Sequence, residues 1–458
     1  MGLNIDKAAD APISQDALAP VLEALLLRAK HYGASHADAI ATHGRSLSVK
    51  VRDGALEDVD NSEGKDIGLR VIIGKRQACV SSSDLSEHSL DKLADRAVAM
   101  AKLAPEDPYC GLAPTELLQT DAPELELFDN ALTTPAKLKA RALQIEAATN
   151  SVKGVGRAEG SAASWSTSAI CFKTSHGFSG GWRSSRHGLS AVAIAEKDGN
   201  MERDFAYEGA RWLEDLPAVE SIGTEAGTRA VARLGARQMK SGAIPIIFDR
   251  RVANSLVSAL FGAISGTSIA RGVSFLKGSL GEAIFNPDIT IIDDPLMPRG
   301  HGSRPWDGEG VKTKAHKIIE NGQLTTWLLN TSTAKQLDLK TTGHAMRGMG
   351  TPPGVSSTNS YLLGGQQTPD ELYKMMGNGL LISEMFGPSL NSNTGDYSVG
   401  VSGFEIKNGE VCGAVNEVTI AGNIKDVYKS LIPANDLKFD GSKCSPTVLT
   451  QGLTLAGS

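Results

Sequence analysis

Long apolar segments and clustered cysteines are both missing from this chain of 458 residues. No apolar run approaches the ~20 residues needed to span a bilayer. Residues Met1–Asp16 are polar and acidic, so neither a signal peptide nor a transit peptide is predicted. The cysteines are odd in number, far apart and without CxxC spacing, as expected for reduced thiols in a reducing compartment. We therefore expect a soluble, cytoplasmic protein that does not associate with membranes. The thiols are Cys79, Cys110, Cys171, Cys412 and Cys444.

A dense cluster of basic residues is also missing. The formal net charge is -6, and the basic residues occur only as scattered pairs, which leaves no electrostatic footprint for DNA or RNA. Nucleic acid is therefore not predicted as a partner. Glycine, by contrast, is abundant. Its 49 residues exceed the usual share of about 7% and indicate many turns and closely packed strands.

Residues 1–104 have the pattern of a small α+β domain. Alternating polar and apolar residues lead into a turn at Asp53 and Gly54, which predicts a hairpin. Prolines and the lack of a clear period over 105–133 indicate a linker. The predicted elements are helices over 18–29 and 90–103 and strands over 47–51, 67–74 and 77–82.

Residues 134–241 repeat this plan as a central domain. Thr134 followed by Pro135 predicts a capped helix start, and this helix extends to about Val152. Short alternating segments between Gly and Ser turns then predict a β-meander over 154–211. Helical spacing returns over 218–239.

Residues 242–458 make up the third unit. A predicted strand over Ile244–Phe248 leads directly into a predicted helix over Asp249–Ile264. The remainder is rich in Gly, Asn, Thr and Val and is expected to be mostly β. The predicted fold class is α+β: two N-terminal α+β units are followed by a β-rich C-terminal domain with a long helix near its start. A length of about 150 residues per domain agrees with three units.

Histidines do not form a zinc-peptidase motif in this sequence. No HExxH occurs, although such a motif supplies two metal ligands and a carboxylate base from one helix. His31 and His36 are five residues apart, but Gly33 is expected to end the helix between them. Tyr32 stands where a glutamate base would be needed. A helix terminus facing solvent is the favoured interpretation of this pair.

Two further patterns suggest chemistry. Ser179 is the central residue of a GxSxG sequence, the pattern of a serine nucleophile on a turn between a strand and a helix. Both of its flanks look like strands, so a hairpin turn is favoured. Asp293 and Asp294 follow an apolar strand and could act as paired carboxylates or bind Mg²⁺. Pro295 beside them favours a turn that ends the strand.

From residue 243 onward, many short signatures occur in order, and together they resemble the C-terminal domain of the TldD and PmbA (TldE) peptidase family. Each signature is weak alone, whereas the ordered series is specific. The two N-terminal units also fit this family, so the resemblance covers nearly the whole chain. The signatures are Gly281 with Glu282, Asp293 with Asp294, Asp307–Gly310, Glu320–Gly322, Thr358–Tyr361, Ile406–Gly409 and Ile420–Asn423.

The family contains two kinds of subunit, and in the TldD kind a HExxxH motif on the helix after the first strand of this domain supplies zinc ligands. Aligning that strand with 244–248 places Asn254 and Ala259 at the histidine positions and Ser255 at the glutamate position. No histidine lies between His187 and His301, so a small slip of register changes nothing. The TldD kind also has a cysteine ligand near the C-terminus. Cys444 lies in a comparable region, yet one thiolate cannot make a zinc site alone.

The resemblance therefore implies the PmbA (TldE) kind of subunit, which binds no cofactor itself and pairs with a zinc-bearing TldD-like subunit around a proteolytic chamber. It implies trimming of unfolded peptides in the cytoplasm, including peptide maturation and antitoxin turnover. No catalytic residue is predicted in this chain. Thr358, Asn359 and Ser360 are predicted as a possible peptide contact, with a turn that satisfies its own backbone as the alternative.

Two other functions stay open at this stage. One is a peptide-binding or chaperone-like module that acts without a proteolytic partner. The other is a serine hydrolase that uses Ser179.

Overall fold

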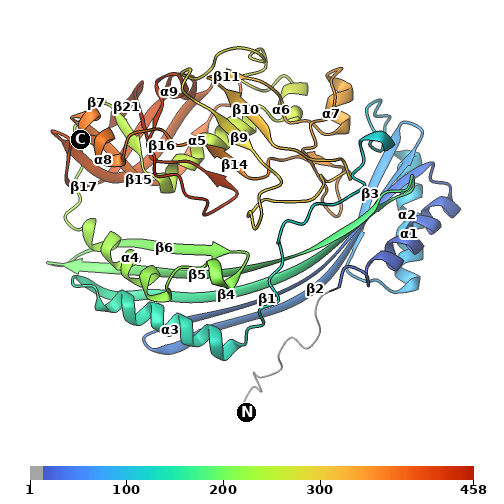
Figure 1. Cartoon of the computed structure of the whole chain (residues 1–458), viewed down its shortest axis with the longest axis horizontal. Coiled ribbons are helices and arrows are strands. Elements are labelled where there is room, and N and C mark those ends of the chain that lie inside the picture. The colour runs from blue at the N-terminus through green and yellow to red at the C-terminus, as the bar shows by residue number, and fades with distance from the viewer. Residues whose placement is uncertain (1–13) are drawn as a thin grey trace.

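A computed structural model describes residues 14–458. The N-terminal segment Met1–Asp16, for which no signal peptide is predicted, therefore lies mostly outside the described residues. A long, curved antiparallel sheet lies below the C-terminal domain in Figure 1, and helices cover the outer face of the sheet. The fold is α+β, as predicted. None of the helices in the described part of the chain has the length and apolar character that a membrane crossing requires.

The curved sheet has six strands in the order β3-β2-β1-β4-β5-β6. Strands β1 and β2 are joined at Asp53 and Gly54, whose φ angles of 53° and 70° allow the tight turn that the sequence predicts. Because β1 pairs with β4, the strands of both N-terminal units form one continuous sheet. The strands are β1 His36–Arg52, β2 Ala55–Ile73, β3 Arg76–Ser82, β4 Val155–Thr174, β5 Ser179–Lys197 and β6 Asn200–Ala210.

Side chains along β1 alternate between the two faces of the sheet. Ala39 and Val49 point to the helices, whereas Ile40 packs with Trp306 of the C-terminal domain. The helices are α1 Ala19–Tyr32 and α2 Glu87–Leu103 at one end, and α3 Pro135–Ser151 and α4 Val219–Ala232 at the other. Period-two patterning thus separates an apolar outer face from an inner face toward the C-terminal domain.

The helices begin largely where the sequence predicts. Thr134 caps α3 by accepting a hydrogen bond from the backbone N–H of Lys137. The predicted helix over 218–239 is too long, because α4 ends at Ala232 and Gly235 turns the chain with a φ of 77°. The predicted linker contains only the short 3-10 helix Thr115–Leu117 within otherwise irregular backbone.

The C-terminal domain is built on an eight-stranded sheet with the order β18-β20-β8-β15-β16-β17-β21-β7 and on a five-stranded sheet with the order β11-β10-β9-β14-β19. The strands are β7 Gly242–Ala243, β8 Ile246–Phe248, β9 Ile291–Asp293, β10 His316–Glu320, β11 Gln323–Leu324, β12 Ala345–Met346, β13 Gly354–Val355, β14 Ser360–Leu362, β15 Gly379–Leu390, β16 Asp396–Lys407, β17 Glu410–Asn423, β18 Ile432–Pro433, β19 Lys443–Cys444, β20 Val448–Thr450 and β21 Leu453–Ala456. The helices are α5 Arg250–Ala263, α6 Gly266–Ala270, α7 Thr331–Gln336, α8 Pro369–Met376 and α9 Ile424–Ser430.

Helix α5 confirms the predicted strand-to-helix unit near the start of this domain. The Asp249 side chain caps the helix by accepting a hydrogen bond from the backbone N–H of Arg251. Leu256, Val257 and Leu260 are buried in the main core of the domain. One face of α5 is therefore fixed by packing, and its opposite face is left for polar residues.

A buried ion triad joins the curved sheet to the C-terminal domain. Asp38 on β1 is fully buried, and its carboxylate accepts hydrogen bonds from Arg70 at 2.5 Å and from Arg347 at 2.9 Å. Burial alone would raise the pKa of Asp38, but the two guanidinium groups outweigh it and lower this pKa. Gly68 beside the triad has no room for a side chain, since a Cβ would lie 2.1 Å from the Met349 carbonyl oxygen.

We predict that Asp38→Asn lowers the free energy of unfolding by about 3–5 kcal/mol, because it leaves two buried guanidinium groups without a counter-charge. Urea denaturation at pH 7 measures this loss. Asp60→Asn, at an exposed position on β2, is the matched control and should change stability by less than about 0.5 kcal/mol. A loss for Asp38→Asn no larger than that of the control contradicts the prediction.

Candidate functional site

Two cavities lie where the inner face of the curved sheet meets the C-terminal domain. The first, the α5 cavity, has a volume of about 410 Å³ and is bordered by the polar face of α5. The second, the His301 cavity, has a volume of about 330 Å³ and is bordered by the loop that carries His301. Glu208 of β6 lines both cavities, so they are neighbours along the edge of the sheet.

The wall of the α5 cavity combines polar helix residues with large apolar side chains. Arg251, Asn254 and Ser255 line it from α5. Ser255 donates its hydroxyl hydrogen to the Val252 carbonyl oxygen at 2.6 Å, a bond within the helix itself. The opposite wall carries exposed rings, with Tyr207 60% and Phe386 51% exposed. This surface can hold apolar and backbone groups of a ligand.

The residues at the predicted motif positions do not fit zinc. Asn254 offers an amide, the Ser255 hydroxyl is engaged with the helix backbone, and Ala259 has no donor atom and packs against the core. Zinc in proteins is bound by imidazole, thiolate or carboxylate groups. Nowhere in residues 14–458 do three or more His, Cys, Asp or Glu side chains gather in a way that could hold a metal ion.

Carboxylates in the α5 cavity are already engaged by basic side chains. Glu384 forms an ion pair with Arg233, which also contacts Asp204 of β6. At the other rim, Asp440 pairs with Arg250 at 2.9 Å. The remaining carboxylates are those of Glu225, which pairs with Arg229 on α4, and Glu208, which pairs with Lys438. These pairs neutralise the acidic groups of the cavity.

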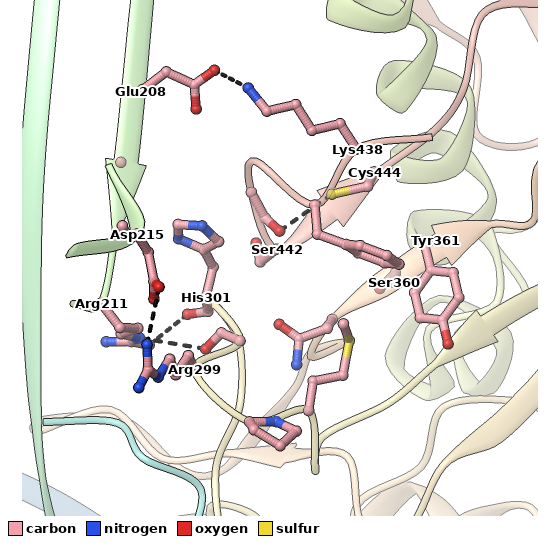
Figure 2. Close-up of a pocket in the computed structure, with 18 residues that line it drawn as sticks. Glu208, Arg211, Asp215, Arg299, His301, Ser360, Tyr361, Lys438, Ser442 and Cys444 are labelled. Carbon is pink, nitrogen blue, oxygen red and sulfur yellow. Dashed lines mark hydrogen bonds and ion pairs between the residues drawn. The ribbon is translucent and has the colours of Figure 1, made fainter. Parts of the chain in front are cut away.

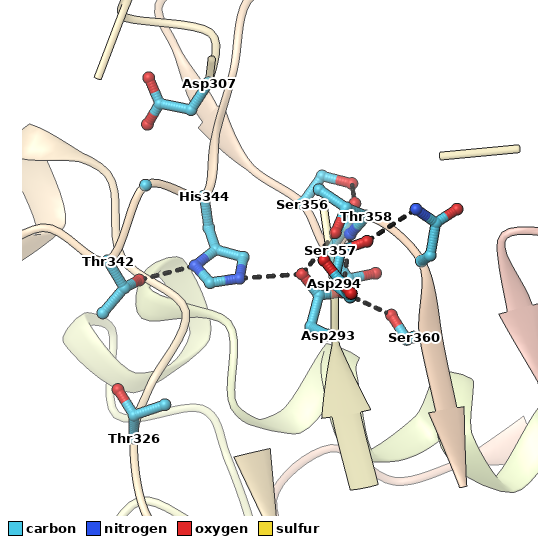
Figure 3. Close-up of polar contacts among 12 residues, drawn as sticks. Asp293, Asp294, Asp307, Thr326, Thr342, His344, Ser356, Ser357, Thr358 and Ser360 are labelled. Carbon is cyan, nitrogen blue, oxygen red and sulfur yellow. Dashed lines mark hydrogen bonds and ion pairs between the residues drawn. The ribbon is translucent and has the colours of Figure 1, made fainter. Parts of the chain in front are cut away.

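Asp293 is the centre of a buried hydrogen-bond network next to the His301 cavity (Figure 3). As predicted, strand β9 ends at this residue. Its carboxylate accepts hydrogen bonds from the Thr358 backbone N–H at 2.8 Å, the Thr358 hydroxyl at 2.7 Å and the Ser360 hydroxyl at 2.8 Å. His344 Nε2 lies 3.1 Å away. Burial acts to raise the pKa of Asp293, but His344 and Thr358 stabilise the charge and lower this pKa.

Asp294 has a different role from its neighbour. Its side chain accepts a hydrogen bond from the Leu296 backbone N–H and thereby closes the turn after β9. The two aspartates therefore do not form a pair with a shared acid-base function.

The predicted peptide contact Thr358–Ser360 is buried. Asn359 donates hydrogen bonds to the Asp294 carbonyl oxygen and to Ser303, and it accepts one from the Gly302 backbone N–H, each at 2.7 Å. Asn359 thus holds the loop that carries His301, whereas Thr358 and Ser360 bind Asp293. Asn359 and Ser360 also line the His301 cavity, so a contact with peptide at this wall stays a prediction.

His301 and Arg211 face Ser360 and Tyr361 across the His301 cavity (Figure 2). Arg211 donates hydrogen bonds to the carbonyl oxygens of Gly300 at 3.3 Å and His301 at 2.6 Å. Burial, together with the charges of Arg186 and Arg211, lowers the pKa of His301 to about 4. The imidazole is therefore neutral near pH 7. The buried thiol of Cys444 also lines this cavity, and burial raises its pKa.

Ser179 lies in a hairpin rather than on a nucleophile turn. It begins β5 and pairs with Lys173 of β4, and no helix follows it. The nearby His176 has both ring nitrogens within hydrogen-bond distance of other groups, Thr174 at 2.7 Å and the Ala113 carbonyl oxygen at 2.8 Å. Neither ring nitrogen is free to act as a base for Ser179.

Sequence patterns contain little indication of the residues that line the His301 cavity. His301 occurs in a Gly-His-Gly fragment, which signals only a turn, and Arg211 follows an edge strand as an isolated arginine. Their common location depends on contacts between residues about 90 positions apart, which no local pattern encodes.

Family models for the PmbA/TldA metallopeptidases match the chain in three consecutive segments. Domain 1 matches residues 37–101, the central domain 129–234 and the C-terminal domain 241–457. The chain belongs to the PmbA/TldD metallopeptidase family.

Relatives with curated names agree with this assignment. The chain is 36% identical to Metalloprotease PmbA of Escherichia coli O157:H7, with 98% of this chain and 97% of the relative covered. It is 33% identical to a Metalloprotease PmbA homolog of Haemophilus influenzae, with 93% of each covered. The structure of TldE from Thermococcus kodakarensis matches with a TM-score of 0.83 at 22% identity, covering 95% of this chain and 100% of that one, which shows a shared fold.

The low pKa of His301 predicts a pH-dependent contribution to stability. Its folded-state pKa of about 4 lies below the ordinary 6.5, so the unfolded chain takes up the proton first as the pH falls. The contribution of His301 to the free energy of unfolding should therefore decrease between pH 6.5 and 4. We expect the stability difference between the wild type and His301→Gln to shift against the wild type over this range.

Urea denaturation at pH 7.5, 6 and 5 measures that difference, and other titrating groups cancel in it. His31→Gln, which removes an exposed histidine from α1, is the control. A stability difference between wild type and His301→Gln that stays constant from pH 7.5 to 5 contradicts the lowered pKa of His301.

Proposed function

We propose that this chain is the TldE-like subunit of a cytoplasmic zinc metallopeptidase complex and that a TldD-like partner supplies the zinc. The complex trims unfolded peptides, as in peptide maturation or antitoxin turnover. In the partner, zinc would activate a water molecule for attack on the peptide carbonyl. This chain contributes the scaffold and part of the chamber wall.

The observation that carries the proposal is the polar face of α5. The chain keeps the family fold, and Leu256 and Leu260 anchor α5 in the core of the C-terminal domain. A helix that carried metal ligands would need the same firm anchoring. The face toward the α5 cavity, however, presents Asn254 and Ser255. The donor atoms at this place favour a wall that contacts substrate over one that holds a metal.

The neighbouring strand supports a peptide as the ligand of this wall. Strand β6 is at the edge of the curved sheet and carries Phe205 and Tyr207, which both line the α5 cavity. An edge strand has unpaired backbone groups that an extended chain can join with little sequence preference. The exposed rings provide apolar contacts along the same edge.

We expect the purified chain to bind no stoichiometric zinc and to cleave no unfolded peptide. Adding the HExxxH paralogue from the same organism should yield a stable complex with one zinc and with cleavage that a chelator abolishes. Metal analysis, size-exclusion chromatography and cleavage of a denatured peptide measure these three results. The paralogue with its motif Glu changed to Gln is the control, since it should assemble without cleaving.

One tightly bound zinc per isolated chain contradicts the proposal. Recovery of the chain from native cells without any HExxxH protein, but with bound peptide, would instead favour a chaperone-like module that acts alone.

We also predict that Ser179→Ala leaves cleavage by the complex within about twofold of the wild type, since Ser179 lies in a hairpin without an available base. Initial cleavage rates at a saturating peptide concentration measure this. A loss of a hundredfold or more would assign the chemistry to Ser179 instead.

A further inference from the structure

Two guanidinium groups lie side by side on the inner face of the curved sheet. His187 of β5 pairs with Ala210, the last residue of β6, so Arg211 follows directly after β6 beside Arg186, and both arginines line one cavity. His187 is buried on the helix-covered face, and the alternation along β5 therefore turns Arg186 toward the C-terminal domain. Like charges at such neighbouring positions repel each other.

Neither arginine has a counter-charge within residues 14–458. Arg211 donates only to backbone carbonyl oxygens, those of Ser185, Gly300 and His301. Arg186 is exposed and makes no hydrogen bond or ion pair with the described residues. Burial and the charge of Arg186 lower the pKa of Arg211 to about 10, which reflects the cost of this unpaired charge. Arg299 nearby differs, because it pairs with three carboxylates.

The sheet next to this arginine pair is a floor made mostly of small polar residues, and the charged residues Arg45 and Asp66 also line the cavity above it. One row across the strands consists of Ser62, Ser46 and Ser166, and Arg186 continues it. A parallel row contains glycines and serines only. A cavity of about 470 Å³ lies over this floor and shares Arg211 with the His301 cavity. The parallel row is Gly64, Gly44, Ser168 and Ser184.

The arginine pair is at one end of this floor. Arg211 reaches from the end of β6 to the carbonyl oxygens of Gly300 and His301, and it lines the floor cavity where this cavity meets the His301 cavity. A peptide that lies on the small residues of the floor would come to its end at Arg186 and Arg211. Of the two terminal groups of a peptide, the α-ammonium would be repelled by two guanidinium groups, whereas the α-carboxylate is the group that guanidinium binds through paired hydrogen bonds.

We propose that Arg186 and Arg211 form a subsite for the C-terminal carboxylate of a peptide lying on the serine and glycine floor of the curved sheet. This subsite rests on the proposed peptide-processing function and adds a substrate class to it, namely peptides with a free carboxyl terminus. Arg186 supplies an unoccupied guanidinium, and Arg211 supplies positive charge fixed by its backbone contacts.

The test compares two forms of one unstructured peptide that carries a fluorophore at its N-terminus and ends in either a free carboxylate or an amide. Fluorescence anisotropy measures binding to the complex with the HExxxH paralogue, whose motif Glu is changed to Gln to prevent cleavage. We expect the amide to bind about tenfold more weakly, the effect of losing one charge-assisted interaction. Arg186→Gln should weaken binding of the free acid by a similar factor and leave the amide unchanged.

Arg183→Gln is the matched control. It removes a positive charge from the same strand, but Arg183 lies over the Phe128 ring and lines neither the floor cavity nor the His301 cavity. This variant should keep the tenfold preference for the free acid. Arg211→Lys keeps the charge and should reduce the preference only in part, and thermal melting confirms that each variant is folded.

Equal binding of acid and amide overturns the proposal, as does a preference that persists in Arg186→Gln. An amidated peptide with one internal Glu that binds as tightly as the free acid also overturns it, since the site would then bind a side-chain carboxylate. If the wild-type complex cleaves peptides in a chelator-sensitive manner while acid and amide bind equally, the proposed function stands and only the subsite fails. If no peptide binds or is cleaved, both fail.

Discussion

The period-two alternation of one long antiparallel sheet governs the rest of this structure. Every strand residue must face either the helices or the C-terminal domain, and β1 supplies both faces along its 17 residues. The outer face is apolar because α1 to α4 cover it. The inner face makes specific contacts where the C-terminal domain touches it, among them those of Ile40, of the ion triad of Asp38 and of Arg211. Away from these contacts, the inner face of the sheet carries small polar residues such as Ser46 and Ser166.

Helix α5 has one face that packing holds in place and one face that packing leaves free. Packing fixes Leu256, Val257 and Leu260, since each is buried in the main core. No packing requirement acts on Asn254, which faces the α5 cavity. Residues on such a face can be exchanged at little cost to folding, so a histidine is not needed there for stability. Packing therefore constrains the buried face of the helix, whereas the face toward the α5 cavity is free to vary with the ligand it meets.

Local patterns predicted those features of the fold that depend on local physics. The capped start of α3 at Thr134 and the tight turn at Asp53 follow from backbone preferences of a few residues. The end of α4 was missed because the apolar spacing continues past Gly235, where the chain already turns. Pairing of β1 with β4 joins residues more than 100 positions apart and could not be predicted from periodicity. The same holds for the site, because Asn254 was identified through family resemblance, whereas Arg186 and Arg211 converge only through strand register.

The α5 cavity and the His301 cavity differ in how far their charged side chains are neutralised. In the α5 cavity, Glu384 and Asp440 are paired with arginines, so its charge is balanced and its exposed rings dominate what it can bind. In the His301 cavity and the floor beside it, Arg211 remains without a carboxylate, and burial together with the charges of Arg186 and Arg211 lowers the pKa of His301. A buried cation without a partner is costly in a protein that binds nothing there. An anion bound at the proposed carboxylate subsite would offset that cost, so charge, rather than apolar contact, would select the ligand there.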